Sequence, residues 1–311
     1  MKVYVLDEIY PGGVELAQKR AEVVRWDDPR VKNWHEDADG LMIRLTRITA
    51  ADFARAKRLK VVVKQGVGVD NIDLPAARDK GVVVCNTPGV NADAVAELTL
   101  GLTLAVARRI AECDRRNRAD GTIDRARFLG LELGGKTVGI IGMGNIGTRV
   151  ARKFHAAFGA HIIAYDPYVP GNHWPDIPHE RLASLDEMWP RADVITPHVP
   201  LTAETRGIVG AAGLARMKPT AIVVNAARGG VVDEPALHEA LKAGRIFGAG
   251  LDVFVSEPPS NRDPLLGLPN VVVTPHAGGG TLETQAKSSI AVAETLLAVF
   301  DGNIPAKARV A

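Results

Sequence analysis

Four polar side chains in the second half of the chain each follow an apolar run that is typical of a buried strand. They are Arg228 after AIVVNA, Asp252 at the end of GAGLD, Glu257 in FVSEPP and His276 after NVVVTP. Because ligands of open α/β sheets bind beyond the carboxyl ends of the strands, we expect these side chains to meet at one edge of a sheet. A guanidinium, carboxylates and an imidazole gathered there would suit the reduction of a ketone by hydride transfer.

Hydride transfer to a carbonyl carbon leaves negative charge on the oxygen, so a proton donor must stand beside that oxygen. His276 is predicted to be this donor because an imidazole exchanges protons near neutral pH. Glu257 would favour the charged ring and orient it, and Arg228 would grip a carboxylate or polarise the carbonyl. Each residue alone has a structural alternative, since a histidine after a strand is more often structural and an arginine there usually makes a salt bridge. The joint arrangement favours catalysis.

A glycine-rich segment, TVGIIGMGNIGTRV, places Gly142, Gly144 and Gly147 between a strand pattern and a helical one. In a dinucleotide-binding fold such glycines allow a tight turn, close approach to a pyrophosphate and close helix–strand packing. The bare GxGxxG pattern is weak, with an ordinary βαβ turn as the alternative. Asp166, however, ends the next strand close to the offset of about 20 residues expected for a ribose-binding carboxylate. It would repel a 2′-phosphate, and the next two residues supply no arginine, which favours NAD over NADP.

Short apolar runs alternate with helical patterns along the whole chain. Near the start the runs are KVYVL, EVVRW, GLMI, KVVVK and GVVVCN, and later they are TVGIIG, AHIIAY, ADVITP, AIVVNA, FGAGLDV and NVVVTP. Nearly continuous apolar strands separated by helices indicate parallel sheets covered on both faces. The two series predict an α/β fold with two doubly wound, Rossmann-like domains.

Two long helical patterns, roughly 92–116 and 281–300, stand between and after these series. The second cannot extend the second sheet, so we expect it to pack back on the first domain. The dinucleotide-binding domain, 92–281, is therefore predicted to be inserted into a flavodoxin-like substrate domain made of 1–91 and 282–311.

Composition narrows the class of protein. The chain has 311 residues, enough for about two domains, of which 46% are hydrophobic and 24% charged. A net charge of +2 gives no basic field for nucleic acid or an anionic membrane. Cys85 and Cys113 have no CxxC neighbour, so we interpret both as reduced thiols without a metal or redox role. The N-terminus, MKVYVLDE, lacks the pattern of a secretory signal, which predicts a cytoplasmic protein.

The chain resembles the D-isomer-specific 2-hydroxyacid dehydrogenase family, most closely its phosphoglycerate dehydrogenase branch, over nearly its whole length. The resemblance is carried by VKQGVGVDNIDL, NTPGVNADAVAELTLGL, LGGKTVGIIGMGNIG, NAARGGVVDE, GLDVFVSEPP and TPHAGGGT. It implies NAD bound between two domains and a homodimer built on the cofactor domain. The family's catalytic trio falls on Arg228, Glu257 and His276.

The resemblance also implies ligand contacts, residue by residue. Gly66, Val67 and Gly68, in QGVGV, resemble the loop whose backbone N–H groups hold the substrate carboxylate. Arg44 and Lys64 lie at strand ends of the first domain, where they either bind a distal phosphate or are ordinary surface charges. The implied cofactor contacts are Gly142, Gly144, Asn145, Ile146, Gly147, Asp166, His198, Val199, Pro200, Thr205, Ala226, Asp252 and Gly278.

We therefore predict an NAD-dependent oxidoreductase that interconverts a small D-2-hydroxy acid and its 2-keto acid. Lys64 stands where phosphoglycerate enzymes often carry arginine, and Val67 replaces a frequent threonine. The substrate thus stays open between 3-phosphoglycerate, hydroxypyruvate or glyoxylate, and a sulfonated or aromatic hydroxy acid. The alternative to an enzyme is an NADH-sensing binding protein, since the family includes transcriptional corepressors that retain the catalytic trio. The chain ends where longer relatives continue into a regulatory domain, so serine feedback through such a domain is not expected.

Overall fold

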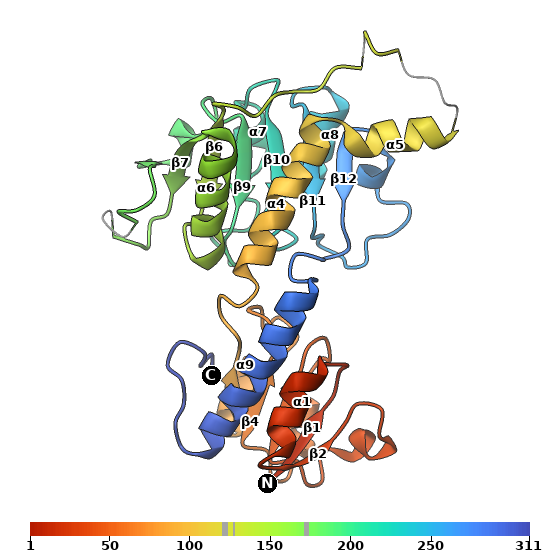
Figure 1. Ribbon diagram of the computed structural model, residues 1–311, viewed down its shortest axis with the longest axis vertical. Helices are drawn as coiled ribbons and strands as arrows, with labels where there is room; N and C mark the ends of the chain where they lie inside the picture. The colour runs from red at the N-terminus through yellow and green to blue at the C-terminus, as the bar shows by residue number, and fades with distance from the viewer. Residues whose placement is uncertain (120–123, 127, 171–173) are drawn as a thin grey trace. The chain divides into compact units, whose positions relative to one another are not determined.

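The computed structural model describes residues 1–119, 124–126, 128–170 and 174–311. The described residues form two compact units, each built around a parallel sheet (Figure 1). The first unit consists of 1–91 and 279–311, and the second consists of 92–278. The second unit therefore interrupts the first along the chain, and it ends at 278 where the sequence predicted 281.

The first unit contains a flavodoxin-like sheet with parallel strands in the order β2-β1-β3-β4-β5. Side chains alternate between its faces: on the fourth strand Val61 and Val63 pack in one apolar cluster and Val62 in another. Both faces are covered, which explains why the strands read as continuous apolar runs. The strands are β1 (Lys2–Val5), β2 (Glu22–Val24), β3 (Gly40–Ile43), β4 (Val61–Lys64) and β5 (Val83–Cys85).

Helices cover both faces of this first sheet. They are α1 (Pro11–Gln18), α2 (Ala50–Arg55), α3 (Leu74–Asp79), α9 (Leu282–Phe300) and a 3-10 turn, η1 (Pro29–Asn33). Helices α1 and α9 lie side by side on one face (Figure 1) and share one apolar cluster, and α2 and α3 contribute to the cluster on the other face. The expectation that the last helix packs back on the first unit is confirmed. Thr281 caps α9 by accepting the N–H of Thr284 at 3.1 Å.

The second unit contains a parallel sheet in the order β12-β11-β10-β9-β6-β7-β8. Its first strand along the chain lies next to its second and fourth, which is the Rossmann arrangement with a switch point between β6 and β9. The strands are β6 (Thr137–Ile141), β7 (His161–Tyr165), β8 (Glu180–Arg181), β9 (Val194–Pro197), β10 (Ile222–Asn225), β11 (Gly248–Leu251) and β12 (Val271–Val273).

Helices also cover both faces of the second sheet. The helices of this unit are α4 (Ala92–Ala107), α5 (Ile110–Ala119), α6 (Asn145–Phe158), α7 (Ala211–Leu214) and α8 (Glu234–Lys242), with the 3-10 turns η2 (Leu185–Glu187) and η3 (Pro264–Gly267). Helix α5 contributes no residue to the apolar clusters that the described residues form on the sheet. Helices α4 and α6 lie side by side (Figure 1) and share one apolar cluster, and α7 and α8 contribute to the other. Within the described ranges, no helix is both long and apolar enough to cross a membrane.

The prediction of one continuous helix over 92–116 is wrong, because the chain forms two helices, α4 and α5, with a break between them. Arg109 lies in the break with φ 53°. The N–H of Leu131 donates to the carbonyl oxygen of Ala107 at 2.7 Å, so a distant segment takes a bond that a continuous helix would use. The Arg109 guanidinium lies 3.7 Å from the centre of the Phe128 ring and 2.9 Å from Glu112. These tertiary contacts outweigh the local helical pattern.

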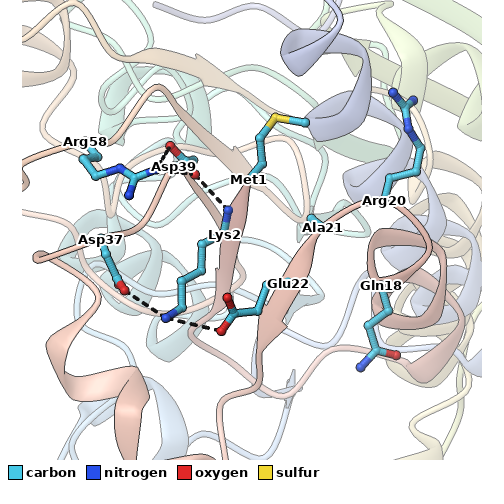
Figure 2. A pocket seen from close by; sticks show the side chains of 9 residues that line it. All are labelled: Met1, Lys2, Gln18, Arg20, Ala21, Glu22, Asp37, Asp39 and Arg58. Carbon is cyan, nitrogen blue, oxygen red and sulfur yellow. Dashed lines mark hydrogen bonds and ion pairs between the residues drawn. The ribbon is translucent and has the colours of Figure 1, made fainter.

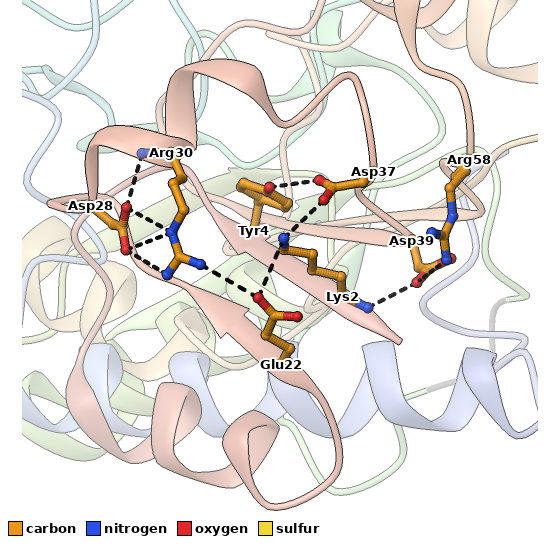
Figure 3. A network of polar contacts seen from close by, with 8 residues as sticks. All are labelled: Lys2, Tyr4, Glu22, Asp28, Arg30, Asp37, Asp39 and Arg58. Carbon is orange, nitrogen blue, oxygen red and sulfur yellow. Dashed lines mark hydrogen bonds and ion pairs between the residues drawn. The ribbon is translucent and has the colours of Figure 1, made fainter.

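A polar pocket lies at the amino ends of β1 and β2. Figure 2 shows Lys2 Nζ between Asp37, at 2.8 Å, and Glu22, at 3.3 Å, while the Lys2 backbone N–H donates to Asp39 at 2.8 Å. In Figure 3 the Tyr4 hydroxyl also donates to Asp37, and the bonds from Lys2 and Tyr4 lower the pKa of that carboxyl. These charges satisfy one another, and ligands of such sheets bind at the opposite ends of the strands. We interpret the network as structural.

Candidate active site

The glycine loop joins β6 to α6, and its glycines have different surroundings. A Cβ at Gly142 (φ +87°) would lie 2.8 Å from the carbonyl oxygen of His198, and one at Gly147 would lie 2.1 Å from the carbonyl oxygen of Gly142. Both positions therefore require glycine. A Cβ at Gly144, by contrast, would meet no atom of the described residues within 4 Å. That open backbone, where α6 begins at Asn145, fits a pyrophosphate approaching the N-terminus of the helix.

Asp166 follows β7 and is oriented by backbone donors. Its Oδ2 accepts the N–H of Met143 at 2.9 Å, and its Oδ1 accepts the N–H of Tyr168 at 3.0 Å. The carboxylate is thus held beside the glycine loop, where a ribose would be bound. Sequence reasoning missed Arg181, whose guanidinium donates to the carbonyl oxygen of Asp166. Only the pairing of β8 with β7 brings Arg181 there, so no local signal in the sequence could have found it.

The HVPLT segment lies against the glycine loop. The N–H of His198 donates to the carbonyl oxygen of Ile141 at 2.7 Å, and the Val199 side chain would lie 2.7 Å from a Cβ at Gly142. The His198 ring places Nε2 at 3.0 Å from Thr196 Oγ1, while Nδ1 is enclosed without a partner among the described residues. The residue as a whole is only half-buried, but burial of the ring lowers its pKa to about 3. A neutral imidazole therefore lines the predicted adenine side.

Thr205 and Ala226, two further predicted cofactor contacts, lie in the framework around this edge. The Thr205 hydroxyl donates to the carbonyl oxygen of Pro200 at 2.5 Å and accepts the N–H of Thr202 at 2.7 Å. Thr205 therefore shapes the turn that presents Pro200. Ala226 is buried directly after β10. Contact of any of these residues with the cofactor stays a prediction.

Arg228 lies in the turn that follows β10. Asn225 fixes this turn, because its Nδ2 donates to the carbonyl oxygen of Arg228 at 2.9 Å and its Oδ1 accepts the N–H of Ala227 at 3.1 Å. Gly229 packs on the loop after β11, since a Cβ there would lie 2.0 Å from the carbonyl oxygen of Phe254. The Arg228 turn and the loop after β11 are therefore in direct backbone contact. Sequence reasoning overlooked Asn225, although a polar residue ending an apolar strand was a visible signal.

The structure brings Glu257 and His276 together. Glu257 Oε2 lies 2.7 Å from His276 Nδ1, and Glu257 Oε1 accepts the N–H of Phe254 at 3.0 Å. The two side chains are 36% and 48% exposed, so a small molecule can reach the ring. His276 has φ 52°, in the left-handed region that few residues other than glycine adopt. Backbone strain of this kind is typical of functional sites.

Asp252 directly follows β11 and holds the loop that carries His276. Its carboxylate accepts the hydroxyl of Thr274 at 2.6 Å and the N–H groups of Ala277 and Gly278 at 2.7 and 2.9 Å. Its carbonyl oxygen accepts the N–H of His276 at 2.7 Å. Asp252 and Gly278 were predicted to meet the nicotinamide. The structure gives them a place in the scaffold of the loop, and the nicotinamide contact stays a prediction.

The predicted substrate residues belong to the first unit, at the carboxyl ends of β3 and β4. The backbone N–H of Arg44 donates to the carboxylate of Asp7, and Lys64 Nζ donates to the carbonyl oxygen of the next residue at 2.8 Å. The N–H of Gly66 donates to Thr87 Oγ1 at 2.8 Å. Gly66 would therefore have to leave Thr87 before it could bind a carboxylate. Substrate contacts of Arg44, Lys64 and the loop through Gly68 stay predictions.

Comparison with known proteins agrees with this geometry. Residues 100–278 match the family model described as D-isomer specific 2-hydroxyacid dehydrogenase, NAD binding domain. A D-3-phosphoglycerate dehydrogenase of Methanocaldococcus jannaschii is 44% identical over 308 residues, which are 98% of this chain and 58% of that protein. A hydroxypyruvate reductase of Thermotoga maritima is 45% identical over 263 residues, 84% of each protein. The crystal structure of TT0316 protein from Thermus thermophilus is similar over 100% of both chains, with a TM-score of 0.88 and 39% identity.

The fold and the glycine loop define a dinucleotide-binding α/β protein with a carboxylate–imidazole pair at the carboxyl edge of its second sheet. The chain belongs to the D-isomer specific 2-hydroxyacid dehydrogenase family. This confirms the resemblance seen in the sequence, and the match to the NAD-binding domain confirms the predicted cofactor. The chain spans just over half the length of the phosphoglycerate dehydrogenases that it matches.

Proposed function

We propose that the protein is an NAD-dependent oxidoreductase that interconverts a D-2-hydroxy acid and its 2-keto acid. The observation that carries the proposal is the 2.7 Å contact between Glu257 Oε2 and His276 Nδ1. A carboxylate at Nδ1 favours the charged ring and leaves Nε2 as the nitrogen that exchanges a proton with the substrate. The cofactor, when bound, supplies or accepts the hydride. The chain supplies the proton through His276 and stabilises charge on the substrate through Arg228.

In the oxidising direction the same side chains act in reverse. Neutral His276 accepts the proton of the substrate hydroxyl, and Glu257 stabilises the imidazolium that forms. Arg228 holds the substrate oxygen or the adjacent carboxylate in place. The turn that carries Arg228 is fixed, because Asn225 binds the backbone of both Ala227 and Arg228. The proton and the hydride thus leave the hydroxy acid by separate routes.

Turnover of NADH against a panel of 2-keto acids, followed by its absorbance, tests the proposal. His276→Gln should lower kcat about 10²- to 10⁴-fold, because an amide cannot deliver the proton, while NADH binding measured by fluorescence stays intact. His161→Gln is the matched control, since His161 is exposed at the amino end of β7. An unchanged rate for the His276 variant would remove it as the proton donor. Tight NADH binding with no turnover of any acid would favour the NADH-sensing binding protein.

Within this class, 3-phosphoglycerate is the first candidate substrate, and hydroxypyruvate or glyoxylate the second. The names of the archaeal and Thermotoga relatives support these two choices. The ratio of kcat/KM for phosphohydroxypyruvate to that for hydroxypyruvate separates them. If Arg44 and Lys64 bind a phosphate, replacing either with Ala should lower kcat/KM about tenfold for the phosphorylated acid alone. Equal losses for both acids would show that neither residue reads the phosphate.

A homodimer built on the second unit and a cytoplasmic location complete the proposal. The family resemblance seen in the sequence supports the dimer. Sedimentation equilibrium of the purified chain tests the first, and a mass of one chain would contradict it. Fractionation of cells that express the chain tests the second.

A further inference from the structure

Two successive peptide units after β11, Val253–Phe254 and Phe254–Val255, are each held by a carboxylate. The N–H of Phe254 donates to Glu257 Oε1 at 3.0 Å, and the N–H of Val255 donates to Glu234 Oε1 at 2.7 Å. Glu234 is the first residue of α8, so its carboxylate comes from a different element. The other oxygen of Glu257 binds His276. The peptide held by Glu234 therefore belongs to the loop that aims Glu257 at the imidazole.

The Phe254–Val255 peptide, which Glu234 holds, also supports the arginine turn. A Cβ at Gly229 would lie 2.0 Å from the carbonyl oxygen of Phe254 and 2.4 Å from the nitrogen of Val255, so the backbone next to Arg228 rests directly on this peptide. Phe254 is buried at 5% exposure, whereas Val255 is 66% exposed. Apolar packing thus anchors the Phe254 side of the peptide, and the bond from Glu234 restrains the Val255 side.

We propose that Glu234 is a positioning residue for the acid–base pair: it fixes the Phe254–Val255 peptide and thereby the orientation of Glu257 toward His276. This inference rests on the proposed dehydrogenase function. A carboxylate suits the task, because a charged acceptor binds an N–H more strongly than a neutral one does. Its place at the N-terminus of α8 adds a favourable interaction with the helix dipole.

The surroundings of Glu234 allow its hydrogen bond to be separated from its charge. Burial raises the pKa of Glu234, and the carboxylates of Asp263, Glu257 and Asp233 raise it further, against the opposing effect of the Val255 N–H. The pKa of Glu234 is therefore higher in the folded protein than in the unfolded chain. Protonated Glu234 favours the folded state below the unfolded pKa, and this stability is lost as pH rises through the folded pKa. Glu234→Gln removes that charge and keeps the Oε1 acceptor, so it should fold at least as well above neutral pH.

The test compares Glu234→Ala, Glu234→Gln and Glu234→Asp, whose shorter side chain withdraws the acceptor but keeps the charge. Loss of the bond should lower kcat about tenfold in the Ala and Asp variants with KM for NADH unchanged, and Gln should restore kcat to within about twofold. Asp263→Asn is the matched control, because this carboxylate lies in the same cluster but accepts only the N–H of Leu265 in the described structure. It should leave kcat unchanged.

A double-mutant cycle shows whether Glu234 acts through Glu257. In a Glu257→Ala background, the additional Glu234→Ala change should cost less than about twofold in kcat, because there is no longer a carboxylate to position. An equal loss in both backgrounds would show a general structural role and overturn the inference. No loss in the single Glu234→Ala variant would overturn it as well.

Crystal structures of the variants give a readout that needs no turnover. The distance between Glu257 Oε2 and His276 Nδ1, 2.7 Å in the unaltered chain, should lengthen beyond hydrogen-bonding range in Glu234→Ala and should recover in Glu234→Gln. If this contact is lost in Glu234→Ala and the unaltered chain turns over no keto acid, the proposed function fails while the positioning role stands. If keto acids are turned over and neither kcat nor this distance responds to Glu234→Ala, the positioning role alone fails.

Discussion

Removing the carboxylate of Asp252 should release the loop that carries His276. In Asp252→Ala, the hydroxyl of Thr274 and the N–H groups of Ala277 and Gly278 lose their acceptor. A buried donor left without a partner costs about 1–3 kcal/mol, which applies in full to the buried N–H of Gly278. The half-buried N–H of Ala277 adds a smaller part, so we expect a loss of about 2–4 kcal/mol. That is a large share of the total stability of about 5–15 kcal/mol for a typical protein.

A graded series separates these bonds. Thr274→Val removes the hydroxyl donor and leaves both backbone bonds to Asp252 in place, so it should cost about 1 kcal/mol and keep most of the activity. Asp252→Asn keeps one acceptor oxygen but turns an NH₂ group toward an N–H, and should fall between Thr274→Val and Asp252→Ala. Urea unfolding gives the stability of each variant, and hydrogen exchange of residues 271–282 reports on the loop itself.

Turnover should fall further in Asp252→Ala than its folded fraction explains, because His276 leaves the strained conformation in which it meets Glu257. Asp263→Ala is the control for losing a carboxylate from the same unit, since among the described residues this carboxylate only caps a short 3-10 turn. If Asp252→Ala kept both wild-type stability and wild-type exchange at the loop, the carboxylate would not be what holds His276. Another contact would then have to hold that residue in place.

Three further predictions concern the acid–base pair and the cofactor loop. Glu257→Gln should lower kcat about tenfold with KM for NADH unchanged, since a neutral amide stabilises the His276 ring less than a carboxylate does when the ring carries the proton; an unchanged kcat would count against the pairing. Asp166→Ala should weaken the preference for NADH over NADPH in kcat/KM, and an undiminished preference would mean that another residue reads the ribose. Gly144→Ala should weaken NADH binding at least about tenfold but keep the midpoint of thermal unfolding. Gly147→Ala should also lower that midpoint, because its Cβ would lie 2.1 Å from a carbonyl oxygen. Equal midpoints for the two variants would contradict this.

The strands were predictable because burial on both faces leaves nearly continuous apolar runs in the sequence. Each of the apolar runs named in the sequence forms a strand, from β1 to β12. One strand, β8, was not predicted, because it has no apolar run. Its two polar residues, Glu180 and Arg181, pair with β7 at the edge of the sheet. The break at Arg109 was equally invisible, because its cause lies in contacts from Phe128 and Leu131 and not in the helical pattern.

The chemistry at the carboxyl edge was predictable where residue type alone limits the possible roles. A histidine and a glutamate on neighbouring strand ends suggested an acid–base pair, and their 2.7 Å contact follows from the order of β11 and β12 in the sheet. The supporting residues were harder to find, because backbone donors are not visible in a sequence. For this reason the sequence did not show that Asp252 holds the backbone of the His276 loop, and Glu234 looked like an ordinary residue in the first turn of a helix.

Two acidic residues, Asp252 and Glu257, hold His276 in an unusual backbone conformation. A φ of 52° costs a non-glycine residue on the order of 1–3 kcal/mol, and the loop keeps it only if other bonds hold the chain on both sides. Asp252 binds the backbone at His276 and at the two residues that follow it, while Glu257 binds the ring. The ring is therefore fixed at the backbone and at Nδ1, and Nε2 has a defined direction before a substrate arrives. Such preorganisation is what a proton donor needs at the moment that charge develops on the substrate oxygen.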